Sequence, residues 1–267
     1  MEYEGLLDGL LAVSRSAGEV VRQDWSGARE ITKKGRIDLV TQTDMRVEEL
    51  LREKLGALLP EAAFYGEESS DGKGPGELAW IVDPVDGTTN FAHSIPFVAV
   101  SVALWADGRP VLAAVNAPML DELYHAARGR GAFCNGAPMR VSDCAKLVDG
   151  IVATGFPYAI ERYVDRILAH MRRMLLATQG VRRPGAAAID MAFVAAGRYD
   201  GFYEYGLKPW DTAAGWLLVE EAGGRVSSMD AAKPYLLGAE NILASNGLLH
   251  EALSEILRKD LEPGRPG

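Results

Sequence analysis

The sequence predicts an α/β protein, of the α+β kind in its first half. Three observations lead to this fold class: helical patterns open the chain, short strands with tight turns follow, and strand and helix patterns alternate from Gly150 onwards. The chain has no internal repeat and no linker long enough to separate independent domains. We therefore expect an N-terminal α+β half over residues 1–145 and a C-terminal α/β half over residues 146–267, packed together as one unit.

Two amphipathic helices are expected near the N-terminus. Apolar residues recur at helical spacing over residues 6–21 and again over residues 47–59. Thr43 or Asp44 stands where a helix cap is needed, and on position alone capping is the favoured role. A short strand is expected over residues 62–65, after the second helix.

Residues 31–40, between these helices, are polar and then β-leaning. The cations Lys33, Lys34 and Arg36 either face a phosphate or are solvated surface charges, and the second role is favoured for any single lysine. A glycine-rich stretch over residues 71–76 predicts a mobile surface loop.

An antiparallel meander is expected next. Strand patterns cover residues 97–105, 111–116 and 123–127, and the dipeptides Asp107-Gly108 and Asn135-Gly136 are typical of hairpin turns. A sheet flanked by the two N-terminal helices accounts for this pattern.

Strands and helices alternate in the second half. The expected strands are residues 151–156, 199–205 and 241–245, and the expected helices are residues 161–178, 186–196 and 212–222, with a further helix near the C-terminus. One helix face is expected to turn inward, and it comprises Val164, Ile167, Leu168, Met171, Met174 and Leu175.

The composition excludes several classes of protein. The 267 residues are 48% hydrophobic, enough for a full core, and carry a formal net charge of −9 without a block of consecutive Lys or Arg, so nucleic-acid binding is not indicated. The N-terminus lacks a signal-peptide pattern and no apolar run approaches the ~20 residues of a membrane span, so we expect a cytoplasmic protein without a membrane partner. Cys134 and Cys144 lack metal or redox spacing and predict reduced thiols.

The chemistry concentrates in W-I-V-D-P-V-D-G-T-T-N-F, residues 80–91. An apolar strand is expected to stop at Asp83-Pro84, because proline lacks the N–H of a further ladder bond. Asp86 adds a second carboxylate, and Gly87 allows the backbone to approach a ligand closely before the hydroxyls and N–H groups of Thr88 and its neighbours. Ligands for hard cations and donors for phosphate thus share one turn, which indicates metal-assisted phosphoryl chemistry.

Two further acidic motifs accompany this turn. G-E-E-S places Glu67 at the end of a predicted strand, and K-P-W-D-T-A-A-G places Asp211 at a helix start. Asp211 has an equally good structural role as a helix cap, and an Asp-x-x-Asp pair alone is more often capping or solvated charge than a metal site. His93, the one histidine close to these motifs, is expected to be structural or peripheral.

In this order, the motifs resemble the inositol monophosphatase family. The likeness extends over essentially the whole chain, including D-L-V-T-Q-T-D, G-A-F-C-N-G and V-E-E-A-G-G. The stretch R-R-P-G-A-A-A-I-D at residues 182–190, followed by Tyr203-Glu204, resembles the bacterial branch, whose members are described as inositol-1-monophosphatases or suppressor proteins.

The resemblance implies a layered α/β/α/β/α sandwich of the sugar phosphatase type, a homodimer and two or three Mg²⁺ ions per site. It assigns Glu67, Asp83 and the carbonyl of Val85 to one ion, and Asp83, Asp86 and Asp211 to a second. The physics agrees, because Mg²⁺ prefers oxygen ligands and this set offers only oxygen.

The resemblance also assigns catalytic and substrate roles. Asp44 and Thr88, with Glu67, match the groups that activate the attacking water. The substrate-binding set comprises Asp86, Gly87, Thr88, Gly185, Ala186, Glu204 and Asp211. Many relatives carry Ser or Thr where this chain has Ala186, so the identity of the polyol is open.

We therefore expect a Mg²⁺-dependent phosphomonoesterase that hydrolyses inositol monophosphate by direct attack of water, without a phosphoenzyme, and that is sensitive to Li⁺. Fructose-1,6-bisphosphate, histidinol phosphate and nucleotide 3′-phosphates are alternative substrates for the same chemistry. An alternative of another class is a regulatory binding protein on the same fold, for which the pair Arg182-Arg183 would serve a partner surface or a dimer interface.

Overall fold

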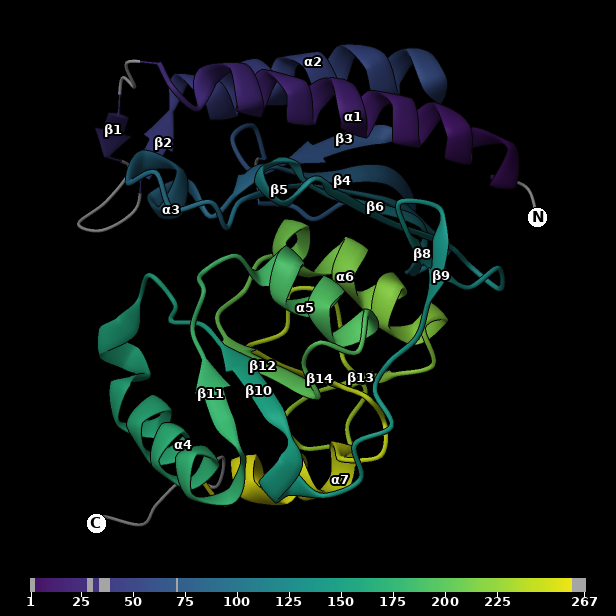
Figure 1. The fold of residues 1–267 in the computed structure, drawn as a ribbon. Helices are drawn as coiled ribbons and strands as arrows, with labels where there is room; N and C mark the ends of the chain where they lie inside the picture. The colour runs from purple at the N-terminus through teal and green to yellow at the C-terminus, as the bar shows by residue number, and fades with distance from the viewer. Residues whose placement is uncertain (1–2, 28–30, 34–38, 71, 261–267) are drawn as a thin grey trace.

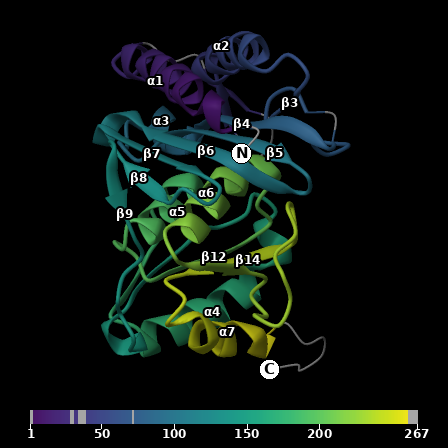
Figure 2. The same cartoon turned by 90° about the vertical axis from the view of Figure 1, so that its right-hand side faces the viewer.

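The computed structural model describes residues 3–27, 31–33, 39–70 and 72–260. Helices and sheets stack in five layers: helices α1 and α2, a seven-stranded sheet, helices α5 and α6, a five-stranded sheet, and helices α4 and α7 (Figure 1). The same layers are visible after a quarter turn about the vertical axis (Figure 2). This arrangement confirms the α/β/α/β/α sandwich.

The outer layer consists of the two long helices expected from the sequence, α1 (Leu7–Asp24) and α2 (Gln42–Leu58). Their apolar stripes are buried against the seven-stranded sheet, with Leu10, Leu51 and Leu55 fully covered. An antiparallel pair, β1 (Ile31–Lys33) and β2 (Leu39–Thr41), joins them. Lys34 and Arg36, and the side chain of Lys33, lie outside the described part, so their contact with a phosphate stays a prediction.

The seven-stranded sheet has the order β3-β4-β5-β6-β7-β8-β9, with one parallel pair, β3 and β4. Its strands are β3 (Ala63–Gly66), β4 (Leu78–Asp86), β5 (Ala99–Ala106), β6 (Arg109–Ala117), β7 (Glu122–Ala127), β8 (Ala132–Cys134) and β9 (Ala137–Met139). Both predicted hairpin turns are confirmed, because Asp107-Gly108 and Asn135-Gly136 each place two successive residues at positive φ.

Strand β4 runs further than the sequence predicted. The expected stop at Asp83-Pro84 is wrong, since the strand continues to Asp86. Its pairing with β5 shifts register between Asp83 and Asp86, and β3 pairs with it only as far as Val82. Pro84 therefore lies in a β-bulge. The sheet needs no hydrogen bond from its backbone nitrogen there, so the missing N–H has no cost. The bulge brings both aspartates to the end of one strand.

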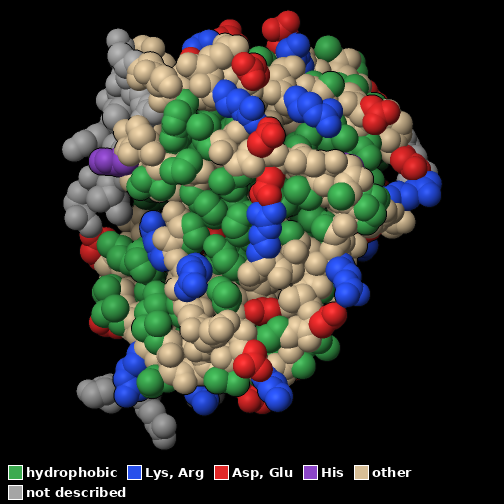
Figure 3. Space-filling view, in the orientation of Figure 1, with side chains coloured by type: hydrophobic (Ala, Val, Ile, Leu, Met, Phe, Trp, Pro, Cys, Tyr) green, Lys and Arg blue, Asp and Glu red, His purple; other side chains and the backbone are tan. Residues whose placement is uncertain are grey.

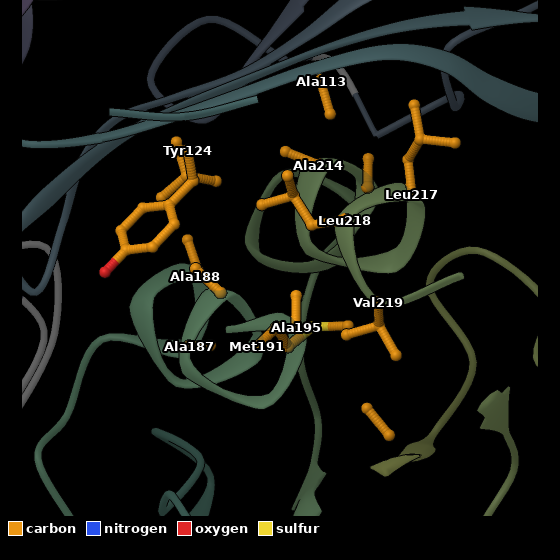
Figure 4. Close-up of a cluster of buried hydrophobic side chains, with 14 of the residues drawn as sticks. Ala113, Tyr124, Ala187, Ala188, Met191, Ala195, Ala214, Leu217, Leu218 and Val219 are labelled. Atoms are coloured by element: carbon orange, nitrogen blue, oxygen red, sulfur yellow. The ribbon is translucent and has the colours of Figure 1, made fainter. Parts of the chain in front are cut away.

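The central layer is formed by α5 (Ala187–Ala195) and α6 (Pro209–Glu221), which lie side by side between the two sheets. Small and branched apolar side chains from both helices meet Ala113 and Tyr124 of the upper sheet in one buried cluster (Figure 4). All of α5 except Phe193 is buried, whereas α6 is buried along its middle and partly exposed at both ends and at Trp216, with Glu220 exposed. The cluster packs the two predicted halves together, although the boundary at residues 145 and 146 stays a prediction.

The lower sheet has the order β11-β10-β12-β14-β13. Its strands are β10 (Ile151–Thr154), β11 (Gly180–Arg182), β12 (Gly201–Tyr205), β13 (Arg225–Ser227) and β14 (Asn241–Ser245). The sequence analysis missed β11 and β13, which have three residues each and are too short to show a period. Helices α4 (Val164–Ala177) and α7 (His250–Leu257) cover the outer face.

Short 3-10 turns complete the secondary structure at Glu4–Leu6, Pro118–Leu120, Leu147–Asp149, Ile160–Arg162 and Arg258–Asp260. The predicted loop at residues 71–76 has no regular structure where it is described, and Gly72, Gly74 and Gly76 have positive φ. Cys134 and Cys144 are free thiols, as expected. Among the described helices, none combines the length and the hydropathy that crossing a membrane requires.

The inward face predicted for α4 is partly wrong. Ile167 and Met174 are buried as expected, but Leu168 is 61% and Leu175 57% exposed. His170, which a hydrophobic pattern cannot select, takes a core position and contacts the carbonyl of Leu257 through Nε2. The helix is therefore rotated relative to the prediction, and leucines face outward.

Candidate active site

A cavity of about 530 Å³ lies at the end of β4, between the seven-stranded sheet and the elements of the second half. Ten of the eleven predicted site residues line it: Glu67, Asp83, Val85, Asp86, Gly87, Thr88, Gly185, Ala186, Glu204 and Asp211. The eleventh, Asp44, is fully buried behind Thr88. A larger cavity of about 1200 Å³ shares Lys208 and Trp210 with it but is lined by none of the eleven.

Gly87 forms the turn between β4 and the short helix α3 (Thr88–Ala92). Its φ of 90° lies in the left-handed region, and a Cβ here would stand 2.9 Å from the carbonyl oxygen of Phe97 and 3.3 Å from the Cβ of Ala186. Glycine is therefore required twice, for the turn and for the close approach of the two halves. The N–H groups of the first turn of α3 have no partner within the helix by geometry, so they can donate to an anion in the cavity.

Thr88 and Asp44 are in contact, as the sequence analysis expected. The Thr88 hydroxyl lies 3.1 Å from Asp44 Oδ1 and 3.0 Å from the carbonyl oxygen of Val85. The other carboxylate oxygen of Asp44 accepts the backbone N–H of Thr41 at 2.9 Å and the Thr41 hydroxyl. Burial raises the pKa of Asp44, and these hydrogen bonds offset only part of the rise.

Asp44 and Asp211 occupy the same local position. Each is the third residue of its helix, and each accepts the backbone N–H of the preceding N-cap residue, Thr41 in one case and Lys208, at 2.6 Å, in the other. The N-cap role considered for Asp44 and Asp211 is therefore wrong, because the N-cap residues are Thr41 and Lys208, three positions earlier in the chain. The capping bond occupies one oxygen, Oδ2, in both carboxylates and leaves Oδ1 for other contacts.

The acidic side chains of the cavity influence one another strongly. Burial, together with the charges of Glu67, Asp86 and Asp211, holds the pKa of Asp83 well above its ordinary value. Burial raises the pKa of Asp86 to about 7, with a contribution from Glu67. Burial and the neighbouring Asp86 likewise raise the pKa of Asp211 to about 7. Buried carboxylates this close together repel one another when they are ionised, and a bound cation would stabilise their charged forms.

Asp86 also connects the two halves. Its Oδ2 accepts the N–H of Ala188, in the first turn of α5, at 2.7 Å. Ala186, the N-cap of α5, has no side-chain oxygen for this purpose, so a carboxylate from β4 caps the helix instead. Ala186 is 1% exposed, and its small side chain fits against Gly87.

Glu204 enters the cavity from β12. Gly155 lies directly against its carboxylate, since a Cβ on that glycine would be 2.2 Å from Oε2. Burial, with the charge of Asp211, raises the pKa of Glu204 well above its ordinary value, and the nearby Arg183 opposes the rise. Its position at the wall of the cavity suits a group that accepts hydrogen bonds from hydroxyls.

Glu67 follows directly on β3. Its backbone N–H donates to the carbonyl oxygen of Val82 on β4 at 3.1 Å, which brings the G-E-E-S segment beside the strand that carries Asp83. The carboxylate is half-buried and lines the cavity. The parallel pairing of β3 and β4 thus places two carboxylates from separate motifs at the same end of the sheet.

These residues suit a divalent cation by chemistry. The described residues contain no ready-made cluster of three or more acidic, histidine or cysteine side chains. The acidic groups of the cavity nevertheless offer only oxygen, and Asp83 Oδ1 is buried without a hydrogen-bond partner. A hard cation would satisfy that oxygen and neutralise the mutual repulsion of the carboxylates. Which of them bind metal stays a prediction.

Sequence reasoning missed several residues of the site. The side-chain contacts of Asn90 were not foreseen: Nδ2 donates to the carbonyl oxygen of Phe97 at 2.8 Å and to that of Pro184, in the second half, at 2.9 Å. Arg183 and Phe156 line the mouth of the cavity, with the guanidinium 4.8 Å from the ring centre. The two consecutive arginines in the sequence could have drawn attention to Arg183, but no sequence pattern indicated Phe156. His93 does not line the cavity, as expected.

Comparison with known proteins gives consistent results. The model of the inositol monophosphatase family matches residues 2–262. An inositol-1-monophosphatase of Mesorhizobium japonicum is 39% identical over 98% of this chain and 99% of its own length. The Nus factor SuhB of Escherichia coli K12 is 38% identical over 96% of this chain and 97% of its own.

Solved structures agree with these relatives. The extragenic suppressor protein suhB from Bartonella henselae has a TM-score of 0.88 and 37% identity, covering 96% of this chain and all of that one. A structure described as IMPase/NADP phosphatase complexed with Mg²⁺ and phosphate has a TM-score of 0.84 and 27% identity, covering 99% of this chain and 98% of that one.

Proposed function

We propose that this chain, which belongs to the inositol monophosphatase family, is a phosphatase that uses Mg²⁺ to hydrolyse inositol monophosphate to inositol and phosphate. The observation that carries the proposal is the cavity at the end of β4. It combines oxygen-only acidic residues, the Asp44–Thr88 contact and the Gly87 turn in a volume of about 530 Å³. A volume of this size suits a small phosphorylated polyol or sugar.

Asp44 and Thr88 would activate the attacking water. The Thr88 hydroxyl donates towards Asp44 Oδ1, so its oxygen can accept a hydrogen bond from a water in the cavity. As the water attacks phosphorus, its proton passes to Thr88, and the Thr88 proton passes to Asp44. The raised pKa of Asp44 favours its role as a base, while the Thr41 bonds fix its orientation.

The phosphate would lie against the turn at Gly87. The backbone N–H groups of Gly87 and Thr88 would donate hydrogen bonds to the phosphoryl oxygens, on which negative charge develops. Because a side chain at Gly87 would collide with Phe97 and Ala186, the backbone itself forms this wall. Direct displacement by water needs no Ser, Cys or His nucleophile, and among the described residues that line the cavity there is neither Cys nor His.

Glu67, Asp83, Asp86 and Asp211, with the Val85 carbonyl, are the residues that would hold two or three Mg²⁺ ions. When bound, such ions polarise the phosphoryl oxygens, lower the pKa of the attacking water and stabilise the leaving alkoxide. The complex of a structural neighbour with Mg²⁺ and phosphate supports this choice of metal.

Glu204 and the Gly185-Ala186 backbone would bind the hydroxyl groups of the alcohol. With alanine at position 186, only backbone atoms of that residue are available for hydrogen bonds. Fructose-1,6-bisphosphate, histidinol phosphate and nucleotide 3′-phosphates are the alternative substrates for the same cavity, since specificity depends on this wall.

A phosphate-release screen tests the proposal. Purified protein would be assayed with inositol, sugar, histidinol and nucleotide phosphates, with Mg²⁺ and with EDTA. We expect Mg²⁺-dependent release, highest with myo-inositol 1-phosphate. No release from any of these compounds would refute the proposed activity, and a preference for another compound would correct the substrate alone.

The protein is further proposed to be a homodimer that uses the exposed face of α4. Val164, Leu168, Leu175 and Leu176 are between 38% and 74% exposed on this helix. Hydrophobic side chains gather at the lower left of the surface, over α4 (Figure 3). An apolar helix face of this kind is typical of an isologous interface.

Light scattering would measure the mass of the particle. We expect a dimer for the natural chain and a monomer for Leu168→Glu combined with Leu175→Glu. Leu248→Glu is the matched control, because Leu248 is as exposed as Leu168, at 61%, but lies outside α4. A natural chain that stays monomeric at high concentration would contradict the assembly.

A second function of another class, as a regulatory binding protein, is supported by the similarity to the Nus factor SuhB of E. coli. Arg182 and Arg183 are exposed and offer a basic contact in an acidic protein. Capture of a stoichiometric partner that persists in Asp83→Asn but is lost in Arg182→Ala would establish it. A partner captured equally by all three forms would exclude the basic contact.

A further inference from the structure

Helix α2 contacts the active site in two places. Asp44, in its first turn, reaches Thr88, and Glu48 lies one helical turn further along the same face. The Glu48 side chain is only 5% exposed, and the proposed mechanism of hydrolysis gives it no role. A buried carboxylate close to the cavity needs an explanation.

Glu48 holds the segment that carries Glu67. Its Oε2 accepts the backbone N–H of Glu68 at 2.8 Å. The preceding N–H, that of Glu67, donates to Val82 at 3.1 Å. Two successive N–H groups on either side of the Glu67 carboxylate are thereby fixed, one by β4 and one by α2.

Arg52 completes this contact from the next turn of α2. Its Nη2 donates to Glu48 Oε1 at 3.2 Å and also to the hydroxyl of Ser69. The guanidinium lies over the ring of Phe64, 4.1 Å from the ring centre. Arg52 therefore neutralises Glu48 and binds the far end of the G-E-E-S segment.

Gly66 makes the close approach possible. A Cβ on this residue would stand 2.5 Å from Glu48 Oε2, so any side chain here would have to displace the Glu48 carboxylate. The glycine and the serine of G-E-E-S are thus explained by contacts with α2. Only Glu67, between them, is directed to the cavity.

We propose that Glu48 is a positioning residue for the metal-binding role of Glu67. The inference rests on the proposed function of Glu67. Glu67 lies in a turn that follows β3, outside the regular strand that precedes it. The Glu48 contact adds a constraint from α2 to this turn and links the position of Glu67 to the helix that carries Asp44. Removal of an outer partner of this kind costs about 10–100-fold in metal affinity.

Calorimetric titration with Mg²⁺ alone would test the proposal without reference to activity. We expect Glu48→Ala to weaken Mg²⁺ binding by at least about tenfold. Glu48→Gln keeps an acceptor for the Glu68 N–H and should recover most of the affinity. Glu49→Ala is the matched control, because it removes the same charge one residue further on, from an exposed position.

A second pair of variants reaches the same contact from the other side. Gly66→Ala should displace the Glu48 carboxylate and weaken Mg²⁺ binding to a similar degree, whereas Gly56→Ala, on the open face of α2, should not. Thermal unfolding of each variant shows that it is folded. A purely structural role for Glu48 would lower the unfolding temperature without changing Mg²⁺ affinity.

Equal affinities of Glu48→Ala and Glu49→Ala for Mg²⁺ would overturn the proposal. If the natural chain binds Mg²⁺ but releases no phosphate from any substrate, the proposed function fails while the titration still decides the role of Glu48. If all forms are active and only Glu48→Ala and Gly66→Ala need more Mg²⁺, both proposals stand.

Discussion

Metal affinity should depend steeply on pH, because protons and cations compete for the same carboxylates. Asp86 and Asp211 both have a pKa raised to about 7. A group with this pKa is ionised in about one molecule in eleven at pH 6 and in about ten of eleven at pH 8. If binding requires both groups to be ionised, these two alone raise Mg²⁺ affinity about tenfold each, and therefore about 100-fold from pH 6 to pH 8, and Asp83, whose pKa is raised as well, adds to this rise.

The assay is calorimetric titration of metal-free protein with Mg²⁺ at pH 6, 7 and 8. Repeating it in buffers with different ionisation enthalpies counts the protons that binding releases, and we expect at least about two at pH 6. Asp86→Asn should reduce the rise by at least about tenfold, because it removes one titrating group and also the charge that raises the pKa of Asp211. Affinity that is the same at pH 6 and pH 8, with no proton released, would refute the reasoning.

Other variants and conditions test separate parts of the site. Asp83→Asn should lower turnover by more than about 100-fold, the upper range for loss of an outer partner, while unfolding of the metal-free protein shows an unchanged or higher midpoint. Gly87→Ala should destabilise the protein by more than the ~1–2 kcal/mol of a left-handed residue, and by more than Gly108→Ala in urea unfolding, because only Gly87 also meets a backbone oxygen. Li⁺ should inhibit phosphate release, and a Li⁺ effect that excess Mg²⁺ leaves unchanged would contradict competition at a metal site. In EDTA the stability should be highest near pH 4 and fall towards pH 7, because the raised pKa values of Asp86 and Asp211 make the folded state bind more protons in that window; calorimetry showing a rise would reverse the sign.

Much of the fold could be predicted because its signals are local. The long N-terminal helices have a strong hydrophobic period, and both are present. The two hairpin dipeptides require positive φ, and both turns have it. The β4 bulge could not be predicted, since it is a shift in the pairing of β4 with β5 and thus depends on the neighbouring strand. The orientation of α4 was wrong for a similar reason: a pattern of leucines does not tell which of two apolar faces packs inward, and His170 took the core position.

The candidate site could be predicted as a set of residues but not as an arrangement. The motifs indicated which side chains meet, and ten of them do line one cavity. The links between distant segments had no signal in the sequence. The bond from Ala188 to Asp86 and the bond from Asn90 to Pro184 join residues about a hundred positions apart. Such contacts depend on tertiary packing, which a single sequence does not display.

Capping and catalysis are not alternatives for the aspartates at the helix starts. For Asp44 and Asp211 the sequence offered a structural role and a chemical one, and each side chain has two oxygens. Oδ2 accepts the N–H of the N-cap residue in both cases, which fixes the carboxylate by its own helix. In Asp44 the remaining oxygen meets Thr88, and in Asp211 the carboxylate lines the cavity. Because the bond to the N-cap already restricts the side chain, less rotamer freedom would be lost when the other oxygen takes its proposed role, so the cap would favour Asp44 as a base and Asp211 as a metal ligand.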